Sequence, residues 1–400
     1  MTWLDIPANS PFGPGNLPLG IFRLGDEEPR MGAAIGDQVI DLAAVASAQQ
    51  LDSSQLFTEP TLNAFLALGR PFWQATRQWL LDLVSNESNR ATVEPHLISQ
   101  SAVTMQLPFE VADYVDFYAS EQHATNLGRL FRPDSEPLLP NWKHLPVGYH
   151  GRAGTVVVSG TDIVRPSGQR KAPTDAVPAY GPSQRLDIEV ELGYVVGSPS
   201  TLGRPVPVDD FRDHVYGVVV VNDWSARDLQ AWEYVPLGPF LGKSFATSIS
   251  PWVVSLDALE AAAVPLGKQE PAVLPYLASD SLTNFDITFE VYWNGEHVSS
   301  PPYRDMYWSP AQMLAHLSVN GASVRTGDLF ASGTVSGADK DQRGSFIELS
   351  WGGREPITVK GEERTFLQDG DEVTITASAT TADGTVIGLG SVTGRILPAL

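Results

Sequence analysis

The stretch Leu186-Asp187-Ile188-Glu189-Val190-Glu191-Leu192 alternates apolar and acidic residues. Because successive side chains of a β-strand point to opposite faces, it predicts a strand with one apolar face and one face that carries three carboxylates. The apolar face is typical of a strand that packs on a core. Carboxylates in a row repel one another unless solvent screens them or a cation lies beside them. A solvated face is the common explanation, and a bound divalent cation is the alternative.

The rest of the chain predicts a mainly β fold with few helices. Short apolar runs at residues 155–158, 215–220, 287–293 and 373–376 are separated by turns rich in the 35 glycines and 31 prolines. Helices are expected over residues 72–84 and after Ser309, which can cap a helix that has Pro310 at its first position.

A length of 400 residues suits two or three domains. We expect an N-terminal domain over residues 1–106, with short strands at 20–23, 30–35 and 38–41, and a second domain over residues 107–400 that carries the chemistry.

Composition excludes several classes of function. The 47 acidic residues outnumber the 26 basic ones, so the surface repels nucleic acid and anionic lipid, and neither a nucleic acid nor a membrane is expected as a partner. Without cysteine there is no disulfide, thiolate zinc site or cysteine nucleophile. The N-terminus does not resemble a signal peptide, and the longest apolar run is too short to span a bilayer. We therefore expect a cytoplasmic protein.

Two segments carry candidate catalytic residues. In Asp116-Phe117-Tyr118-Ala119-Ser120-Glu121-Gln122-His123, the histidine lies at the start of a short helix that Gly128 is expected to close. The helix dipole there favours neutral imidazole, the form that a general base requires, although a packing histidine is the commoner case. In the second segment, Arg227, Gln230 and Tyr234 follow helical spacing and could bind a carboxylate or an oxyanion; a solvated face is the alternative, weakened by the flanking Trp224 and Trp232, which predict packing.

Three further residues stand out by their surroundings. Lys243 lies in an apolar segment rich in glycine and proline, so it is either a surface lysine or a buried one that needs carboxylates nearby. Thr334 lies among small residues that let a ligand approach, although a plain turn has the same composition. Glu348 lies in an apolar segment and is expected to have a specific partner, for which a histidine is suitable. The sequence has no Gly-x-Ser-x-Gly, Walker, His-Glu-x-x-His or Gly-x-Gly-x-x-Gly motif, and we expect no organic cofactor.

Taken together, these motifs resemble the fumarylacetoacetate hydrolase family over essentially the whole chain. The resemblance rests on residues 16–18, 32–38, 116–118, 122–126, 139–142, 144–152, 222–228 and 232–245. It implies a small SH3-like β-barrel domain followed by a large β-rich roll domain, assembled as a homodimer. It also implies a metal-dependent hydrolase of the last step of tyrosine and phenylalanine catabolism, which cleaves a carbon–carbon bond of 4-fumarylacetoacetate to give fumarate and acetoacetate.

The resemblance assigns roles to individual positions. It implies a metal site formed by Asp116, Glu189, Glu191 and Asp223, with Lys243 and Thr247 at positions linked to a magnesium ion. It implies a catalytic base, His123, oriented by Glu348, and donors for the developing negative charge at Lys243, Arg227 and Gln230. The implied substrate contacts are Tyr118, Arg132, Tyr149, Gln230, Tyr234 and Thr334.

An all-oxygen ligand set favours calcium, magnesium or manganese over zinc or copper. Four carboxylates and one divalent ion leave two negative charges, so we predict that Lys243 is buried against the acidic residues and that Arg227 lies nearby. Two other functions remain open at this point. One is a different reaction on the same fold: acylpyruvate hydrolysis, oxaloacetate decarboxylation or hydration of dienoic acids. The other is a non-catalytic calcium-binding or scaffold protein.

Overall fold

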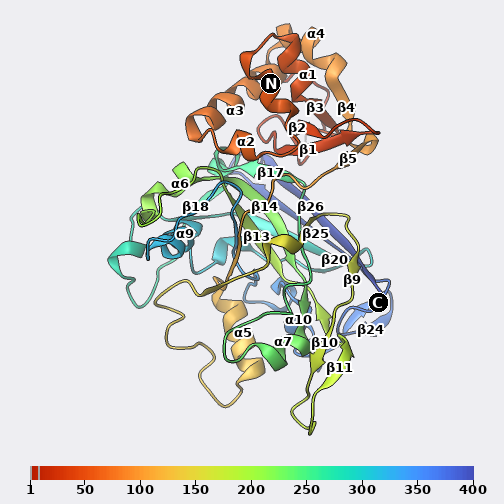
Figure 1. Ribbon diagram of the computed structural model, residues 1–400, viewed down its shortest axis with the longest axis vertical. Coiled ribbons are helices and arrows are strands. Elements are labelled where there is room, and N and C mark those ends of the chain that lie inside the picture. Colours follow the sequence, from red (N-terminus) through yellow and green to blue (C-terminus); the bar gives the residue numbers. More distant parts are fainter. Residues whose placement is uncertain (1, 8–9) are drawn as a thin grey trace.

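The fold is described from a computed structural model that covers residues 2–7 and 10–400. Strands form most of the framework, and most helices are short, so the prediction of a mainly β fold with few helices is confirmed. Within the described ranges, none of the helices combines the length and the apolar character that a membrane span requires. Figure 1 shows a smaller N-terminal part seated on a larger body that contains the long strands.

The N-terminal part consists of a small antiparallel sheet covered by helices. Its strands are β1 (Leu19–Leu24), β2 (Arg30–Ile35), β3 (Gln38–Asp41), β4 (Leu97–Ser99) and β5 (Val103–Met105). Its α-helices are α1 (Leu42–Ala48), α2 (Asn63–Leu66), α3 (Arg70–Ser85) and α4 (Arg90–Val93). The three expected strands and the helix expected at 72–84 are confirmed. Trp73, Leu80 and Leu83 form the buried face of α3.

The main sheet continues from this part into the larger body. Its order is β4-β3-β2-β1-β17-β14-β13-β22-β6-β7. The strands of the larger body along this order are β6 (Tyr114–Phe117), β7 (Gly148–His150), β13 (Val190–Val196), β14 (Val215–Asp223), β17 (Trp252–Ser255) and β22 (Leu329–Ala331), and two short strands, β8 (Val156–Val158) and β16 (Thr247–Ile249), join the same sheet beside β14. Because β1 pairs with β17, main-chain hydrogen bonds join the two domains predicted at residues 1–106 and 107–400. The domain boundary and the SH3-like character of the first part stay predictions.

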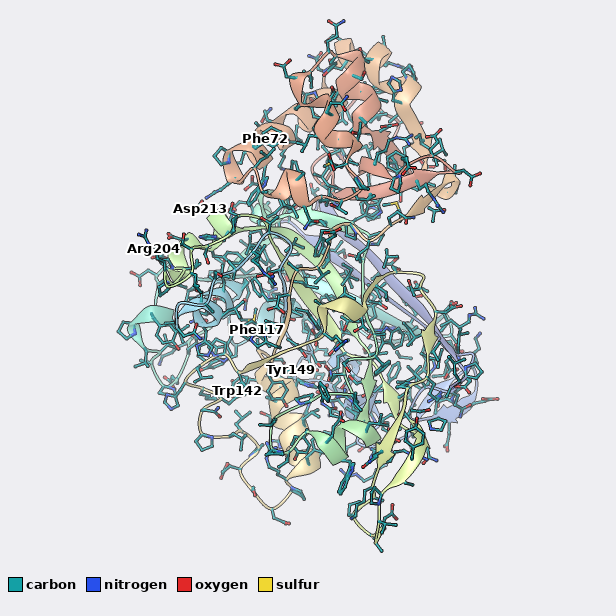
Figure 2. All side chains as sticks on the ribbon, viewed as in Figure 1. Phe72, Phe117, Trp142, Tyr149, Arg204 and Asp213 are labelled. Atoms are coloured by element: carbon teal, nitrogen blue, oxygen red, sulfur yellow. The ribbon has the colours of Figure 1, made fainter. Side chains whose placement is uncertain are left out.

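A second sheet packs against the first and encloses the larger core. Its order is β21-β20-β25-β26-β9, with β9 (Ile163–Val164), β20 (Ile287–Trp293), β21 (Glu296–Ser299), β25 (Glu372–Thr380) and β26 (Val386–Leu397). Every second residue of β20 is buried, as in a strand that packs one face on a core. In Figure 2 the labelled Phe117 and Trp142 lie in the middle of this larger body, well away from Phe72 in the N-terminal part.

The remaining elements are short. They include β8 (Val156–Val158), β10 (Ser167–Arg170), β11 (Ala179–Pro182), β12 (Leu186–Asp187), β15 (Ser225–Ala226), β16 (Thr247–Ile249), β18 (Ala263–Pro265), β19 (Thr283–Phe285), β23 (Ile357–Val359), β24 (Glu362–Arg364), α5 (Glu121–Phe131), α6 (Phe211–His214), α7 (Arg227–Glu233), α8 (Leu256–Leu259), α9 (Pro310–Ser318) and α10 (Phe346–Leu349). The helix predicted after Ser309 is confirmed as α9, which begins with a capping box of Ser309 and Gln312.

The stretch 186–192 is not one continuous strand, contrary to our expectation. It contains β12 and the start of β13, and Ile188 and Glu189 lie between the two. The amides of these two residues donate to side chains, Ile188 N–H to Asp187 Oδ1 (2.8 Å) and Glu189 N–H to Asn222 Oδ1 (3.3 Å). The alternation itself holds, but the solvated alternative is wrong, because all three acidic residues are buried.

Helix α5 extends further than predicted. Ser120 caps its N-terminus by accepting a hydrogen bond from the His123 amide at 3.2 Å, and the helix continues past Gly128 to Phe131. Gly128 is needed for contact rather than for termination, since a Cβ there would lie 2.0 Å from the carbonyl oxygen of Pro137. A glycine that permits close packing and one that ends a helix look alike in sequence.

Candidate metal centre and active site

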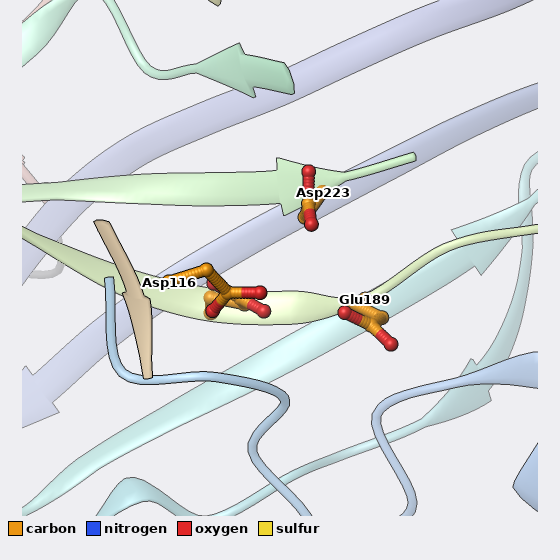
Figure 3. A group of neighbouring side chains, drawn as sticks. Asp116, Glu189 and Asp223 are labelled. Atoms are coloured by element: carbon orange, nitrogen blue, oxygen red, sulfur yellow. The ribbon is translucent and has the colours of Figure 1, made fainter. Parts of the chain in front are cut away.

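Four buried carboxylates meet where the ends of neighbouring strands come together, and we call them the acidic cluster. Asp116 lies in β6, Glu189 just before β13, Glu191 in β13, and Asp223 at the end of β14. One oxygen of each lies within 4.8 Å of one oxygen of every other, and their exposed fractions are 0 to 5%. Figure 3 shows the labelled Asp116, Glu189 and Asp223 gathered from three separate segments.

Two buried cations hold one side of the acidic cluster. The Lys243 ammonium donates to Glu189 and, at 2.9 Å, to Asp223 Oδ2. Arg227 donates from Nη1 to Glu189 Oε1 at 2.7 Å and from Nε to Asp187 Oδ2 at 2.8 Å. The prediction that Lys243 is buried against the acidic residues is therefore confirmed, and the surface alternative is wrong.

The loop that carries Lys243 reaches the cluster because Gly242 packs directly on α7. A Cβ at Gly242 would lie 2.8 Å from the amide nitrogen of Gln230. Its own amide donates to Glu233 Oε1 at 2.6 Å, which ties the loop to the end of the helix. A larger residue at this position would push Lys243 away from its carboxylate partners.

The carboxylates differ in their electrostatic surroundings. Burial acts to raise the pKa of Glu189, but the charges of Lys243 and Arg227 lower it to about 2. Burial and the neighbouring charges of Asp116 and Asp223 raise the pKa of Glu191 well above its ordinary value. Burial and the charge of Asp223 also raise the pKa of Asp116. One side of the cluster is thus compensated by cations, and the other is not.

The cluster has the properties of a divalent cation site. Among residues 2–7 and 10–400, both Glu191 carboxylate oxygens and Asp116 Oδ1 are buried without a hydrogen-bond partner. Buried polar atoms are normally paired, so three such oxygens in one place require an explanation. Their oxygen-only chemistry suits a hard divalent cation. The residues present therefore fit such an ion.

His123 and Glu348 form a second buried unit. His123 Nδ1 lies 2.7 Å from Glu348 Oε2, and both side chains are almost fully buried. Glu348 also accepts from Asn126 Nδ2 (2.9 Å), Ser336 Oγ (3.0 Å) and Ser345 Oγ (2.6 Å). Burial acts to raise the pKa of Glu348, but His123 and these donors hold it below its ordinary value. An ionised acceptor at Nδ1 places the proton there, so Nε2 keeps its lone pair.

Two family models cover almost the whole sequence. The model described as "Fumarylacetoacetate (FAA) hydrolase C-terminal" matches residues 113–397, and "Fumarylacetoacetase N-terminal" matches residues 15–108. The chain belongs to the fumarylacetoacetate hydrolase family. Its relatives include fumarylacetoacetase of Homo sapiens, 48% identical over 100% of this chain and 99% of the relative, and that of Arabidopsis thaliana, 43% identical over 99% and 98%.

Solved structures of more distant proteins share the fold. A fumarylacetoacetate hydrolase from Exiguobacterium antarcticum has a TM-score of 0.58 at 18% identity and covers 96% of this chain and 99% of its own. Maleylpyruvate hydrolase from Sphingobium sp. SYK-6, in complex with manganese(II) ion and pyruvate, has a TM-score of 0.52 at 15% identity and covers 96% of this chain and 100% of its own. The likeness shows that the architecture belongs to the fumarylacetoacetate hydrolase fold.

In this member of the fumarylacetoacetate hydrolase family, two predicted substrate contacts lie beside His123 and the acidic cluster. The Tyr118 ring meets the His123 ring edge to face, with 5.3 Å between the centroids, and burial raises the pKa of the Tyr118 phenol. The Tyr149 hydroxyl donates to Asp223 Oδ2 at 3.4 Å. Both phenols can therefore serve as neutral donors at the edge of the acidic cluster.

The other predicted substrate contacts either lie away from the acidic cluster or have a polar atom without a hydrogen-bond partner among the described residues. Arg132 follows α5, donates to the Pro137 carbonyl at 2.9 Å and lines a cavity of about 560 Å³ between α5 and residues 135–140. Thr334 is buried, and its hydroxyl has no hydrogen-bond partner in the part of the chain that the structure describes. Tyr234 lies just beyond α7 and is 41% exposed, so it does not share the buried position of Arg227. Trp232, expected to be packed, is also 41% exposed.

Lys243 and Thr247 were predicted at positions linked to a metal ion. Thr247 Oγ1 donates to Asp223 Oδ1 at 2.7 Å, and Lys243 holds the other oxygen of the same carboxylate. A protonated amine has no lone pair to offer, so the Lys243 side chain orients Asp223 rather than ligating a cation.

Sequence reasoning missed the residues that hold Glu348. Asn126 follows His123 by three positions on α5, so both side chains lie on one face of the helix, and this spacing was a usable signal. Ser336 and Ser345 come from a loop and a helix start, and serines are common in both. Only the fold shows that these two face the same carboxylate.

Proposed function

We propose that this chain hydrolyses the carbon–carbon bond of 4-fumarylacetoacetate to fumarate and acetoacetate. The observation that carries the proposal is the pairing of a buried His123–Glu348 unit with an acidic cluster that has unpaired oxygens, in a chain that matches fumarylacetoacetases over its full length. A cation-storage protein needs no such histidine, so the arrangement favours an enzyme over a binding protein.

His123 is positioned to act as the general base. With the proton held on Nδ1 by Glu348, Nε2 takes a proton from water, and the hydroxide attacks the ketone carbonyl nearest the fumaroyl end. The carbon–carbon bond then breaks, its electron pair leaves as the enolate of acetoacetate, and the imidazolium returns the proton. Glu348 stabilises the imidazolium and fixes the orientation of the ring.

Asp116, Glu189, Glu191 and Asp223 would hold the divalent cation. Such an ion would supply a Lewis acid that stabilises the negative charge developing on the substrate. Lys243, Thr247 and Tyr149 set the orientation of Asp223 through three hydrogen bonds. The chain therefore fixes the donor geometry before substrate arrives.

Arg227 and Gln230 are suited to receive the oxyanion. Arg227 Nη1 donates to Gln230 Oε1 at 3.2 Å, which turns the amide so that its NH₂ group faces away from the arginine. Arg227 Nη2 is buried and unpartnered among the residues for which the structure gives a position. Arg227 Nη2 is therefore free among the described residues to serve the substrate, and the Gln230 amide and the Tyr118 hydroxyl are further candidate donors.

We also propose calcium or magnesium, with manganese as a further possibility, as the ion, a homodimer as the assembly, and the cytoplasmic last step of tyrosine and phenylalanine catabolism as the setting. The ion choice is supported by the oxygen-only donors. Association is supported by exposed apolar side chains at Val235, Leu237 and Phe240, beside the loop that carries Lys243. Location and pathway rest on the family relationship.

The test follows the loss of fumarylacetoacetate absorbance with metal-loaded parent protein, His123→Ala and a matched control, His316→Ala. His316 is half-buried and pairs with Tyr276 outside the site. We expect a loss of about 10²–10⁴-fold in turnover for His123→Ala only, as for a general base. Undiminished turnover by His123→Ala would refute the assigned base. A parent that acts on an acylpyruvate or on oxaloacetate instead would refute the substrate.

A further inference from the structure

Asp187 is a buried carboxylate that the proposed reaction does not use. It lies outside the acidic cluster, and its exposed fraction is 0%. Its Oδ1 accepts from the amides of Ile188 (2.8 Å) and Phe346 (2.7 Å). Its Oδ2 accepts from the Ile347 amide (3.1 Å) and from Arg227 Nε (2.8 Å). A carboxylate with four donors has its orientation fully determined.

Three of these hydrogen bonds, from Phe346, Ile347 and Arg227, connect two separate parts of the site. Phe346 and Ile347 begin α10, whose third residue is Glu348, the partner of His123. On the other side, Arg227 reaches Glu189 and Gln230. Helix α10 has only four residues, and a single turn has little stability of its own. Its position must therefore come from contacts such as the one with Asp187.

We propose that Asp187 is a positioning residue that sets the distance between the general-base unit and the oxyanion donors. The proposal rests on the proposed hydrolysis and deepens it. Asp187 touches no substrate and acts through Arg227 and Glu348. Because attack and charge stabilisation occur at adjacent atoms of one substrate, a small shift of either part costs rate rather than binding.

Another buried Asp–Arg pair supplies a matched control. Asp371 is 5% exposed, pairs with Arg364, and accepts from the Gln368 amide at 2.7 Å and from Asn294 Nδ2 at 2.9 Å. It therefore combines an arginine and a backbone amide as Asp187 does, yet its partners are not residues of the site. A loss of rate caused only by damage to a buried ion pair would appear in both Asp→Asn variants.

The experiment compares Asp187→Asn and Asp371→Asn at saturating Mn²⁺, using soluble protein with a native circular dichroism spectrum. With its oxygen at the Oδ1 position, asparagine can still accept from the Phe346 amide, but its NH₂ group then faces two other donors, the Ile347 amide and Arg227 Nε. We expect kcat to fall about 10–100-fold for Asp187→Asn with KM within about threefold, as for a residue that orients catalytic groups. Asp371→Asn is expected to stay within about twofold in both constants.

A double-mutant cycle with Glu348→Gln tests whether Asp187 works through the base unit. The combined loss is expected to be about tenfold smaller than the product of the single losses, because residues of one network are not additive. Independent losses, a change confined to KM, or an equal loss in Asp371→Asn would overturn the proposal.

A further measurement does not require any Asp187 variant to fold. If Asp187 couples Arg227 to α10, the Phe346 and Ile347 amides should exchange at least about tenfold faster in Arg227→Lys than in the parent. The reason is that lysine cannot contact Asp187 and Glu189 together as arginine does. Unchanged exchange at both amides would overturn the linkage. A parent without fumarylacetoacetate turnover would refute the proposed function, and the exchange result would still decide whether Asp187 couples the two parts.

Discussion

Glu189 and Glu191 lie two positions apart and face the same site, yet their surroundings differ. Glu189 receives hydrogen bonds from Lys243 and Arg227, and its pKa is lowered to about 2 despite burial. Burial and neighbouring acidic groups raise the pKa of Glu191, and neither of its oxygens has a hydrogen-bond partner in the described ranges 2–7 and 10–400. Burial alone therefore does not set the pKa of these two glutamates: two nearby cations lower that of Glu189, whereas burial keeps the pKa of Asp223 raised although Lys243 donates to it.

The difference indicates how the site divides its charge. With Asp187 included, five buried carboxylates meet two buried cations, so three negative charges remain when all five are ionised. A divalent ion would compensate two of them. The chain compensates the side of Glu189 by its own residues and leaves the side of Glu191 and Asp116 for a ligand. Metal removal and substitutions on each side can show whether Glu189 and Glu191 differ in this way.

The largest effect is expected from removal of the metal. Chelation should lower turnover of fumarylacetoacetate about a thousandfold, because a Lewis acid supplies several kcal/mol of charge stabilisation, and each 1.36 kcal/mol is tenfold in rate. Absorbance assays after dialysis against chelator, and again after addition of Mg²⁺, Ca²⁺ or Mn²⁺, measure it. Full activity in protein shown to be metal-free would contradict the assignment of the Glu191 side to an ion.

The next largest effect is expected where Lys243 compensates the negative charge of Glu189 and Asp223. Lys243→Met should lower the free energy of unfolding by about 3–5 kcal/mol, because Glu189 and Asp223 lose a buried cation. Urea denaturation measures the change. Lys340→Met is the matched control, since Lys340 pairs with Glu355 at the surface, and its effect should be far smaller. Equal effects of the two substitutions would show that Lys243 does not compensate buried charge.

The sharpest comparison substitutes the two glutamates themselves in metal-free protein at pH 8. Glu189→Gln should destabilise the chain by about 2 kcal/mol or more, because Lys243 and Arg227 each lose an anionic partner. Glu191→Gln should stabilise it. The raised pKa means that the stability contributed by Glu191 is lost as pH rises from the unfolded pKa through the folded one, and glutamine cannot ionise. If the urea midpoints of Glu189→Gln and Glu191→Gln shifted in the same direction, the proposed difference in charge compensation between the two glutamates would be contradicted.

The smallest effect concerns Glu348, a buried glutamate outside the acidic cluster that accepts hydrogen bonds from several donors. Its lowered pKa means that it contributes stability above its unfolded pKa of about 4.3, and that this contribution is lost as pH falls through the folded pKa. The stability difference between metal-free parent and Glu348→Gln should therefore shrink from about pH 5 downward. Denaturant titrations at several pH values measure it, and a constant difference would show that Glu348 is not held ionised.

Much of the local structure could be predicted from the sequence because it depends on neighbouring residues. The alternation of residues 186–192, the capping box at Ser309 and the three N-terminal strands follow from side-chain period and turn residues. The length of α5 could not be predicted, because whether Gly128 ends a helix or permits contact with Pro137 depends on a loop that packs on it. The break at Ile188 depended in the same way on Asp187 and Asn222.

The site likewise depends partly on local sequence and partly on contacts between distant residues. The sequence by itself determined which residues can ligate a cation or move a proton, because that depends on the chemistry of the side chains. Only the tertiary structure decided that Arg227 donates a hydrogen bond to Asp187, 40 residues away in the sequence, and that Lys243 donates one to Glu189, 54 residues away. The charge state of a buried carboxylate depends on which cation lies within a few ångströms, and chain folding sets that distance. For this reason, Glu189 and Glu191, two positions apart in the sequence, differ in how their charge is compensated.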